Sequence, residues 1–319
     1  MKSLVAALAL ALLAPAAGAL DLQGHRGARA LAPENSLAAF ELGIRLGAST
    51  LELDAAITRD GVVVVHHDLE PNPIHTRDAQ GRWLEGPQRP IHTMTWDELQ
   101  QLDIGRIRPG TDYARQFPDQ KPIDGTRIPR LSDLFDMVKR NGHTKIRFAI
   151  ETKLNPLRPD DTQAPEPFAQ ALVAEIRKAG MEDRVQVMSF DWRTLQVVQR
   201  IAPTIPTVYL RAQQHWTDNI GAGRDDTSPW TAGIAWREHR SVPKMIKAAG
   251  GRYWSAFHRD LNADLVREAQ ALGLKVLAWT VNDEATMRKL LDMKVDGLIT
   301  DRPDLGQRVV ASRGLTIEP

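Results

Sequence analysis

The 319-residue sequence contains no cysteine. Disulfides and thiolate metal ligands are therefore excluded, and the stability of the fold must come from a large apolar core. A chain of this length can build such a core in one or two domains. The sequence also lacks a glycine-rich phosphate loop and a G-x-G-x-x-G motif, which removes the usual signature of a doubly wound nucleotide-binding fold.

The charged residues show no excess of either sign. The sequence has 41 Lys and Arg residues against 40 Asp and Glu residues, and its formal net charge is +1 at pH 7. A protein that binds duplex DNA neutralises many phosphates and typically carries a basic face or tail. We therefore expect no nucleic-acid partner, and nothing in the sequence identifies a protein partner.

Apolar runs of membrane-spanning length are also missing. The run from Leu4 to Leu13 follows Lys2 and precedes the small residues Ala17-Gly18-Ala19. It is shorter than the roughly 20 residues that span a bilayer, and the pattern is typical of a cleavable signal peptide over residues 1–19. We expect a periplasmic or secreted protein without stable membrane insertion; the alternative is a retained membrane anchor.

Short apolar segments rich in β-branched residues recur along the chain, and most intervals between them have the length of a helix with its loops. One predicted helix is amphipathic, because Leu37, Phe40 and Ile44 share a face. This alternation predicts an α/β fold, a distorted TIM (β/α)8 barrel that forms one domain over residues 20–319. The expected strands are residues 21–24, 50–57, 62–65, 146–150, 185–188, 207–210, 252–256, 275–279 and 297–300.

Two intervals depart from this alternation. Only Thr58-Arg59-Asp60-Gly61 separates the second and third strands, whereas a parallel crossover needs about a dozen residues. Because Asp60-Gly61 is a typical hairpin turn, we expect an antiparallel hairpin that distorts the barrel. A long interval over about residues 69–145 then forms an insertion, which either covers the site and shapes specificity or is a stabilising surface subdomain.

Charged residues follow a same-face spacing on one expected strand and at the end of another. Glu52 and Asp54 lie two residues apart, as do Glu151 and Lys153. Carboxylates that converge at the carboxyl ends of barrel strands would repel one another without a cation between them. We therefore expect Glu52, Asp54 and Glu151 to hold one divalent metal ion. Hard oxygen ligands favour Ca²⁺ or Mg²⁺, and export tilts the choice slightly to Ca²⁺.

Histidines lie at two strand ends, where they could supply a general base and a general acid. His25 follows the first strand, and His66 and His67 follow the hairpin strand. Adjacent strand residues point to opposite faces, so only one of His66 and His67 can face the site. A single histidine at a strand end is more often structural, but these two share their position with the carboxylates.

Several further residues are candidates for binding an anionic substrate. Arg26 offers a forked donor set, and Lys153 is a compact charge beside Glu151. Asn35 either caps the following helix, as Ser36 also could, or contacts the substrate at the helix N-terminus. Trp279 either packs in the core or contacts the substrate. Asp301, near the C-terminus, is expected first as a cap of the last helix, and the alternative is a supporting role behind the residues that contact the metal or the substrate.

The ordered motifs resemble those of the glycerophosphodiester phosphodiesterase family and span almost the whole chain. The family motifs found here are Gly24-His25-Arg26-Gly27, Pro33-Glu34-Asn35-Ser36, Leu51-Glu52-Leu53-Asp54, Val65-His66-His67-Asp68, Ile150-Glu151-Thr152-Lys153, Ser189-Phe190, Trp279-Thr280-Val281-Asn282 and Thr300-Asp301-Arg302-Pro303. Small departures are Ser36, where the family often has threonine, and Arg130, in place of threonine in the usual Ile-Pro-Thr-Leu.

The resemblance implies that His25 and His67 act as general base and acid, with a metal on the three carboxylates and the phosphate near Arg26 and Lys153. It implies hydrolysis of glycerophosphodiesters, such as glycerophosphocholine or glycerophosphoethanolamine, to sn-glycerol 3-phosphate and an alcohol. One alternative is a lysophospholipase D activity, with Trp83, Trp96 and Tyr113 of the insertion lining an acyl-chain cleft. Another alternative is a non-catalytic glycerophosphodiester-binding protein.

Overall fold

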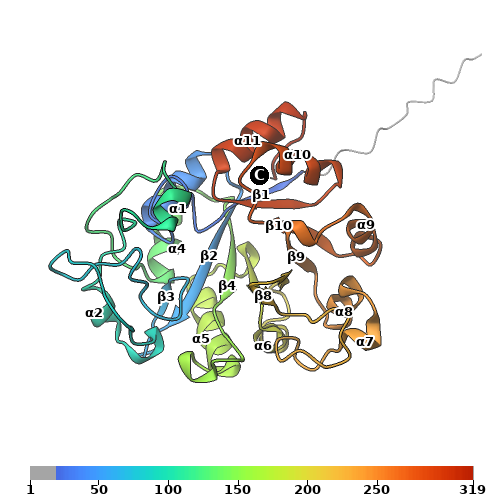
Figure 1. The fold of residues 1–319 in the computed structure, drawn as a ribbon, viewed down its shortest axis with the longest axis horizontal. Helices are drawn as coiled ribbons and strands as arrows, with labels where there is room; N and C mark the ends of the chain where they lie inside the picture. Colours follow the sequence, from blue (N-terminus) through green and yellow to red (C-terminus); the bar gives the residue numbers. More distant parts are fainter. Residues whose placement is uncertain (1–18, 319) are drawn as a thin grey trace, which may run out of the picture.

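A computed structural model describes residues 19–318 of the protein (Figure 1). The expected signal peptide, apart from its last residue Ala19, lies outside the described residues. Among residues 19–318, no helix is both long and apolar enough to cross a membrane.

Within the described residues, eight parallel strands close into a barrel, which confirms the predicted fold. The strand order runs β1-β11-β10-β9-β6-β5-β4-β2, and β1 pairs with both β11 and β2 to close the ring. The strands are β1 (Asp21–Gly24), β2 (Thr50–Ile57), β4 (Arg147–Thr152), β5 (Val185–Ser189), β6 (Thr207–Arg211), β9 (Tyr253–Phe257), β10 (Lys275–Trp279) and β11 (Gly297–Thr300).

Helices surround the strands (Figure 1) and bury the outer faces of the barrel. On β2, Leu51 and Leu53 join this outer core, whereas Glu52 and Asp54 alternate with them and point into the barrel. The longer helices are α1 (Leu37–Arg45), α4 (Leu131–Arg140), α5 (Pro165–Lys178), α6 (Trp192–Ile201), α8 (Val242–Ala248), α9 (Ala263–Ala271), α10 (Glu284–Asp292) and α11 (Pro303–Ser312); a shorter one is α7 (Trp236–His239).

The predicted hairpin is present beside the barrel. Strand β3 (Val63–Val65) pairs antiparallel with β2, and Ala55 lies opposite Val65. Gly61 in the turn has φ +81°, a conformation that glycine adopts without strain. The hairpin brings the chain back along β2, so that the residues after β3 reach the same end of the barrel as Asp54.

The insertion after β3 packs against the outer side of this hairpin. It contains α2 (Trp96–Leu99) and α3 (Asp112–Gln116), and it lies at one edge of the molecule beside β3 (Figure 1). Its apolar residues form a small core of their own with Ala56 and Val64. Helix α4 contacts α1 and β3, so the chain has returned to the barrel wall by Leu131.

A short antiparallel hairpin that the sequence did not predict follows β6. Its strands are β7 (Gln213–Gln214) and β8 (Thr217–Asp218), and Trp216 occupies the turn between them. The Trp216 ring packs edge-on against Phe257 and Trp279. The hairpin therefore adds an aromatic side chain at the mouth of the barrel.

Candidate active site

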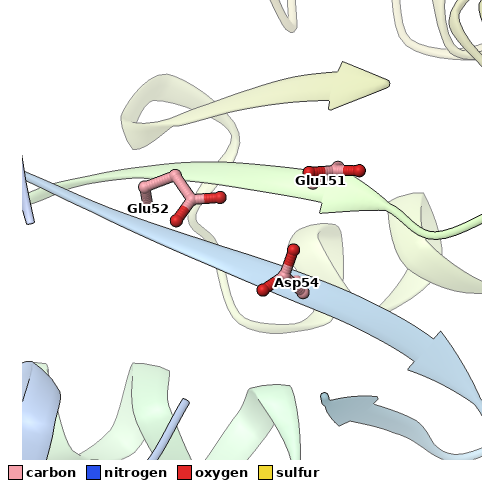
Figure 2. Close-up of side chains that lie close together, drawn as sticks. All are labelled: Glu52, Asp54 and Glu151. Carbon is pink, nitrogen blue, oxygen red and sulfur yellow. The ribbon is translucent and has the colours of Figure 1, made fainter. Parts of the chain in front are cut away.

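Three buried carboxylates meet at the carboxyl ends of β2 and β4. Asp54 lies opposite Glu151 in the parallel register of the two strands, and Glu52 precedes Asp54 on the same face. One oxygen from each residue lies within 4.8 Å of the other two, and Figure 2 shows the three side chains close together on these neighbouring strands. Burial, together with the charges of Asp54 and Glu151, raises the pKa of Glu52 well above its usual range. A cation among these oxygens would remove that repulsion.

Two cationic side chains, Lys153 and Arg26, hold the carboxylates in place. Nζ of Lys153 lies 2.7 Å from Glu151 Oε1 and 3.6 Å from Asp54 Oδ1. Nε of Arg26 lies 3.3 Å from Asp54 Oδ2. Burial would lower the pKa of Lys153, but the charges of Glu151 and Asp54 raise it, so the side chain stays charged. The positive charges of Lys153 and Arg26 thus stabilise the three carboxylates. Their oxygens are hard ligands of the kind that Ca²⁺ and Mg²⁺ prefer.

Asn35 supports this group of carboxylates. Its Nδ2 donates to Asp54 Oδ2 at 2.9 Å, and the side chain is buried. Ser36 caps α1, because its Oγ accepts the N–H of Ala39 at 3.1 Å. The structure therefore assigns the helix cap to Ser36, and the contact of Asn35 with the substrate stays a prediction.

The turn after β1 is held in an uncommon backbone conformation. Arg26 has φ +48° and Asn35 φ +54°, and both lie in the left-handed region that non-glycine residues rarely adopt. Gly27 has φ +90°, and a Cβ there would lie 2.5 Å from the backbone of Ala39 in α1. This turn aims the backbone N–H of Arg26 at Glu52 Oε2, 2.9 Å away.

His25 faces the carboxylates with one ring nitrogen and Asp301 with the other. Its Nε2 lies 3.8 Å from Glu52 Oε2, and its Nδ1 lies 2.6 Å from Asp301 Oδ1. Burial lowers the pKa of His25 to about 4, and the nearby Arg29 adds to this shift. His25 is therefore a neutral imidazole near pH 7, as a general base must be.

Asp301 is fixed by three partners and is not the helix cap that we expected. Arg29 donates to both of its oxygens, at 2.7 and 2.9 Å, and Asn282 donates to Oδ2 at 2.6 Å. Burial opposes ionisation, but Arg29 and His25 hold the pKa of Asp301 well below its usual range. The carboxylate is therefore available as a fixed acceptor for His25.

His67 has a similar arrangement on the other side of the triad. Its Nδ1 lies 2.7 Å from Asp68 Oδ1, and Asn72 donates to Asp68 Oδ2 at 2.7 Å. His67 lines the cavities beside the triad, whereas His66 is buried, with its Nε2 3.3 Å from the carbonyl oxygen of Glu70. Burial, followed by the charges of Arg26 and Lys153, lowers the pKa of His67 to about 4.

The insertion reaches the site through a chain of hydrogen bonds. Arg26 Nη1 donates to Glu34 Oε1 at 2.5 Å, and the hydroxyl group of Tyr113 in α3 donates to the other oxygen of Glu34. His75 lies in the same cluster, with its Nε2 3.7 Å from Asp68 Oδ2. The insertion thus stabilises Glu34, the partner of Arg26, through Tyr113, and Asp68, the partner of His67, through His75.

A cavity of about 260 Å³ opens between these groups and an aromatic wall. His25, Glu52, His67 and Glu151 line its polar side. The opposite side is apolar; Trp279 belongs to it and packs edge-on against Phe190, with ring centroids 5.5 Å apart. The other apolar lining residues are Met188, Leu210, Trp216 and Ile299.

Sequence reasoning missed the residues that support the site. Glu34 and Asp68 lie inside the quoted motifs, and Asp68 follows His67 directly, so their positions gave a signal. Arg29 and Tyr113 gave none, because their partners Asp301 and Glu34 are 272 and 79 residues away.

The chain is similar to known proteins over nearly its whole length. Residues 25–305 match the family model "Glycerophosphoryl diester phosphodiesterase family". A glycerophosphodiester phosphodiesterase of Bacillus subtilis is 27% identical over 293 residues, which cover 89% of this chain and 84% of the relative. The residues matched by the family model include the turn after β1 and the ends of β2 and β4.

Solved structures have the same fold. A "Putative glycerophosphoryl diester phosphodiesterase" from Silicibacter pomeroyi has a TM-score of 0.83 and 35% identity, and the match covers 94% of this chain and 96% of that chain. An Oleispira antarctica phosphodiesterase, in complex with the product sn-glycerol-3-phosphate, has a TM-score of 0.66 and 22% identity, with 91% and 96% of the two chains covered.

Proposed function

The chain belongs to the glycerophosphoryl diester phosphodiesterase family, and from that premise we propose that it hydrolyses glycerophosphodiesters to sn-glycerol 3-phosphate and an alcohol. One observation carries the proposal. Two histidines, each with an aspartate on Nδ1, line one cavity together with Glu52 and Glu151, two of the three converging carboxylates. A phosphodiester needs a base for the attacking oxygen and an acid for the departing one, and this pair can supply both.

Glu52, Asp54 and Glu151 would hold one divalent cation, with Ca²⁺ slightly favoured over Mg²⁺ because calcium is plentiful outside the cytoplasm. When bound, the cation would supply Lewis-acid catalysis and would orient the substrate. Arg26 and Lys153 lie beside the carboxylates and favour the binding of the anionic phosphodiester. Trp279 offers an apolar wall to the carbon atoms of the substrate.

We assign His25 as the base and His67 as the acid. His25 Nε2 takes the proton of the attacking hydroxyl group, which belongs either to water or to the glycerol 2-position. His67 Nε2 gives a proton to the departing alkoxide. Burial, followed by the charges of Arg26 and Lys153, lowers the pKa of His67 in the free protein. A bound phosphodiester anion offsets those two charges and so favours the protonated form of His67.

The lysophospholipase D alternative required an acyl-chain cleft in the insertion. Trp83 instead packs on Arg77, Trp96 packs on Arg130, and Tyr113 binds Glu34. His67 lines two cavities, the one of about 260 Å³ described above and a larger one that adjoins it. None of these three aromatic residues lines either of them. Turnover of lysophosphatidylcholine at a rate comparable to glycerophosphocholine would favour this alternative.

The proposed activity is tested with a panel of glycerophosphodiesters assayed with Ca²⁺, with Mg²⁺ and with a chelator. We expect release of sn-glycerol 3-phosphate that requires a divalent cation. Binding of glycerophosphocholine without turnover in either metal would instead support the non-catalytic binding protein.

Export is a separate proposal that rests on the sequence of residues 1–19. Expression of the full chain in a bacterium, followed by fractionation and N-terminal sequencing, is expected to give an extracytoplasmic protein that begins at Leu20. A protein that keeps Met1 in the membrane fraction would indicate a retained anchor.

A further inference from the structure

A second and larger cavity adjoins the first on the His67 side. Its volume is about 510 Å³, and it shares His67, Glu151, Lys153 and Phe190 with the smaller cavity. The insertion forms one wall, with residues 68–73 and 86–88, and Trp230 and the loop after β4 form the other. We name this space the outer groove. The two spaces therefore meet at the residues expected to flank the phosphorus atom.

The positions of the two histidines indicate which of the two cavities receives the departing alcohol. His25, Glu52 and Arg26 line only the smaller cavity, whereas His67 lines both. If His67 protonates the departing alkoxide, the alcohol must leave on the side of His67 that faces away from His25. The outer groove is the space on that side. This step depends on the proposed function and its assignment of base and acid.

The charged side chains of the outer groove are already paired. Arg158 binds Glu70 and Asp161, and Asp68 accepts from His67 and Asn72. Glu151 belongs to the proposed metal site. Within the described residues, the groove therefore offers no carboxylate whose charge would have to be met by a cationic head group.

The remaining polar groups suit hydroxyl groups, which both donate and accept hydrogen bonds. Asn155 Oδ1 accepts the N–H of Leu157 at 2.9 Å, which leaves its NH₂ group to donate. Gln88 Nε2 donates to the carbonyl oxygens of Glu85 and Gly86, which leaves its Oε1 to accept. Trp230 and Phe190 provide ring faces for the C–H groups of a polyol.

We propose that the outer groove is the head-group subsite and that it selects an uncharged polyol, such as glycerol, inositol or a sugar, over a quaternary ammonium. Cation–π recognition would need several aromatic faces around one point. Such a cluster does exist, formed by Trp216, Phe257 and Trp279, but Trp216 and Trp279 line the smaller cavity and none of the three lines the outer groove. A preference for choline is therefore the outcome that opposes the proposal.

The test compares glycerophosphoinositol with glycerophosphocholine, using the metal-loaded protein. We expect a higher kcat/KM for the inositol substrate. Trp230→Ala and Asn155→Ala are each expected to lower kcat/KM for the inositol substrate by roughly five- to tenfold more than for the choline substrate. Trp216→Ala is the matched control, since it removes an aromatic ring from the smaller cavity, and it is expected to change both substrates by the same factor.

The possible outcomes distinguish a failure of the subsite proposal from a failure of the proposed function. If the wild-type protein turns over no glycerophosphodiester in either metal, the proposed function fails. If it turns over both substrates but prefers choline, or if Trp230→Ala and Asn155→Ala lower both equally, only the subsite is wrong. Trp230→Phe covers the case in which Trp230→Ala does not fold, because it keeps a ring face, and it is expected to restore most of the preference for inositol.

Discussion

Oδ1 of Asp301 lies 2.6 Å from Nδ1 of His25, although 276 residues separate the two in the sequence. This contact places the ring proton on Nδ1 and leaves the lone pair on Nε2, the nitrogen that faces Glu52. Arg29 and Asn282 hold the carboxylate, so the imidazole has one orientation. Asp301 is therefore a positioning residue for the proposed base.

Asp301→Asn is expected to lower kcat by about 10²-fold or more, because the amide no longer fixes the tautomer of His25. The KM should change less, since Asp301 lines neither cavity. The measurement is steady-state kinetics over a range of pH. Asp304→Asn, on the first turn of α11, is the matched control and should keep wild-type kinetics; a large rise in KM with unchanged kcat in Asp301→Asn would contradict the positioning role.

Removal of either histidine tests the proton transfers directly. His25→Ala and His67→Ala are each expected to lower kcat by about 10²- to 10⁴-fold. If His67 is the acid, its variant should recover most of the lost rate on a substrate whose alcohol leaves without protonation, such as a nitrophenyl ester, whereas His25→Ala should not. His239→Ala in α7 serves as the control. Near-wild-type turnover of glycerophosphocholine in either variant would exclude the assigned role.

The carboxylate triad predicts opposite effects of one substitution with and without metal. In the metal-free protein, Glu52→Gln replaces the buried carboxyl group whose ionisation the charges of Asp54 and Glu151 oppose, and we expect the Tm of the variant to equal or exceed that of the wild type. Added Ca²⁺ or Mg²⁺ should raise the Tm of the wild type and have little effect on the variant. Calorimetric titration gives the two affinities. An equal rise in Tm for both proteins would place the metal elsewhere.

Local patterns were enough to predict the fold and the carboxylates. The spacing of Glu52 and Asp54 fixes their common face within one strand, and Asp60-Gly61 identifies the hairpin within four residues. The expected strands agree with the observed ones to within one or two residues. Closure of the barrel through β1 and β2 agrees with a fold class inferred from the alternation of strands and helices.

Contacts between distant parts of the chain could not be predicted in this way. Asp301 follows β11, and a carboxylate before Pro303 has the local pattern of a helix cap. Only the pairing of β1 with β11 brings it to His25. Tyr113 meets Glu34 because the insertion folds back over the turn after β1, and no periodicity in the sequence encodes that path.

Glu34 predicts a pH dependence of stability. Burial would raise its pKa, but the charge of Arg26, followed by that of His75, lowers it from 4.5 to about 2. Because the folded-state value lies below the unfolded one, ionised Glu34 stabilises the fold above about pH 4.5, and this contribution is lost as the pH falls toward 2. The shift corresponds to about 3 kcal/mol at neutral pH. Glu34→Gln should therefore destabilise the protein strongly at pH 7 and much less at pH 3.

Urea unfolding at the two pH values measures the difference in the free energy of unfolding between Glu34→Gln and the wild type. Glu238→Gln, at an exposed position in α7, is the control and should change stability little at either pH. Tyr113→Phe removes one hydrogen bond to Glu34 and should cost about 1 kcal/mol at pH 7. If Glu34→Gln destabilised the protein equally at pH 7 and pH 3, the ion pair with Arg26 would not be the source of its stabilising effect.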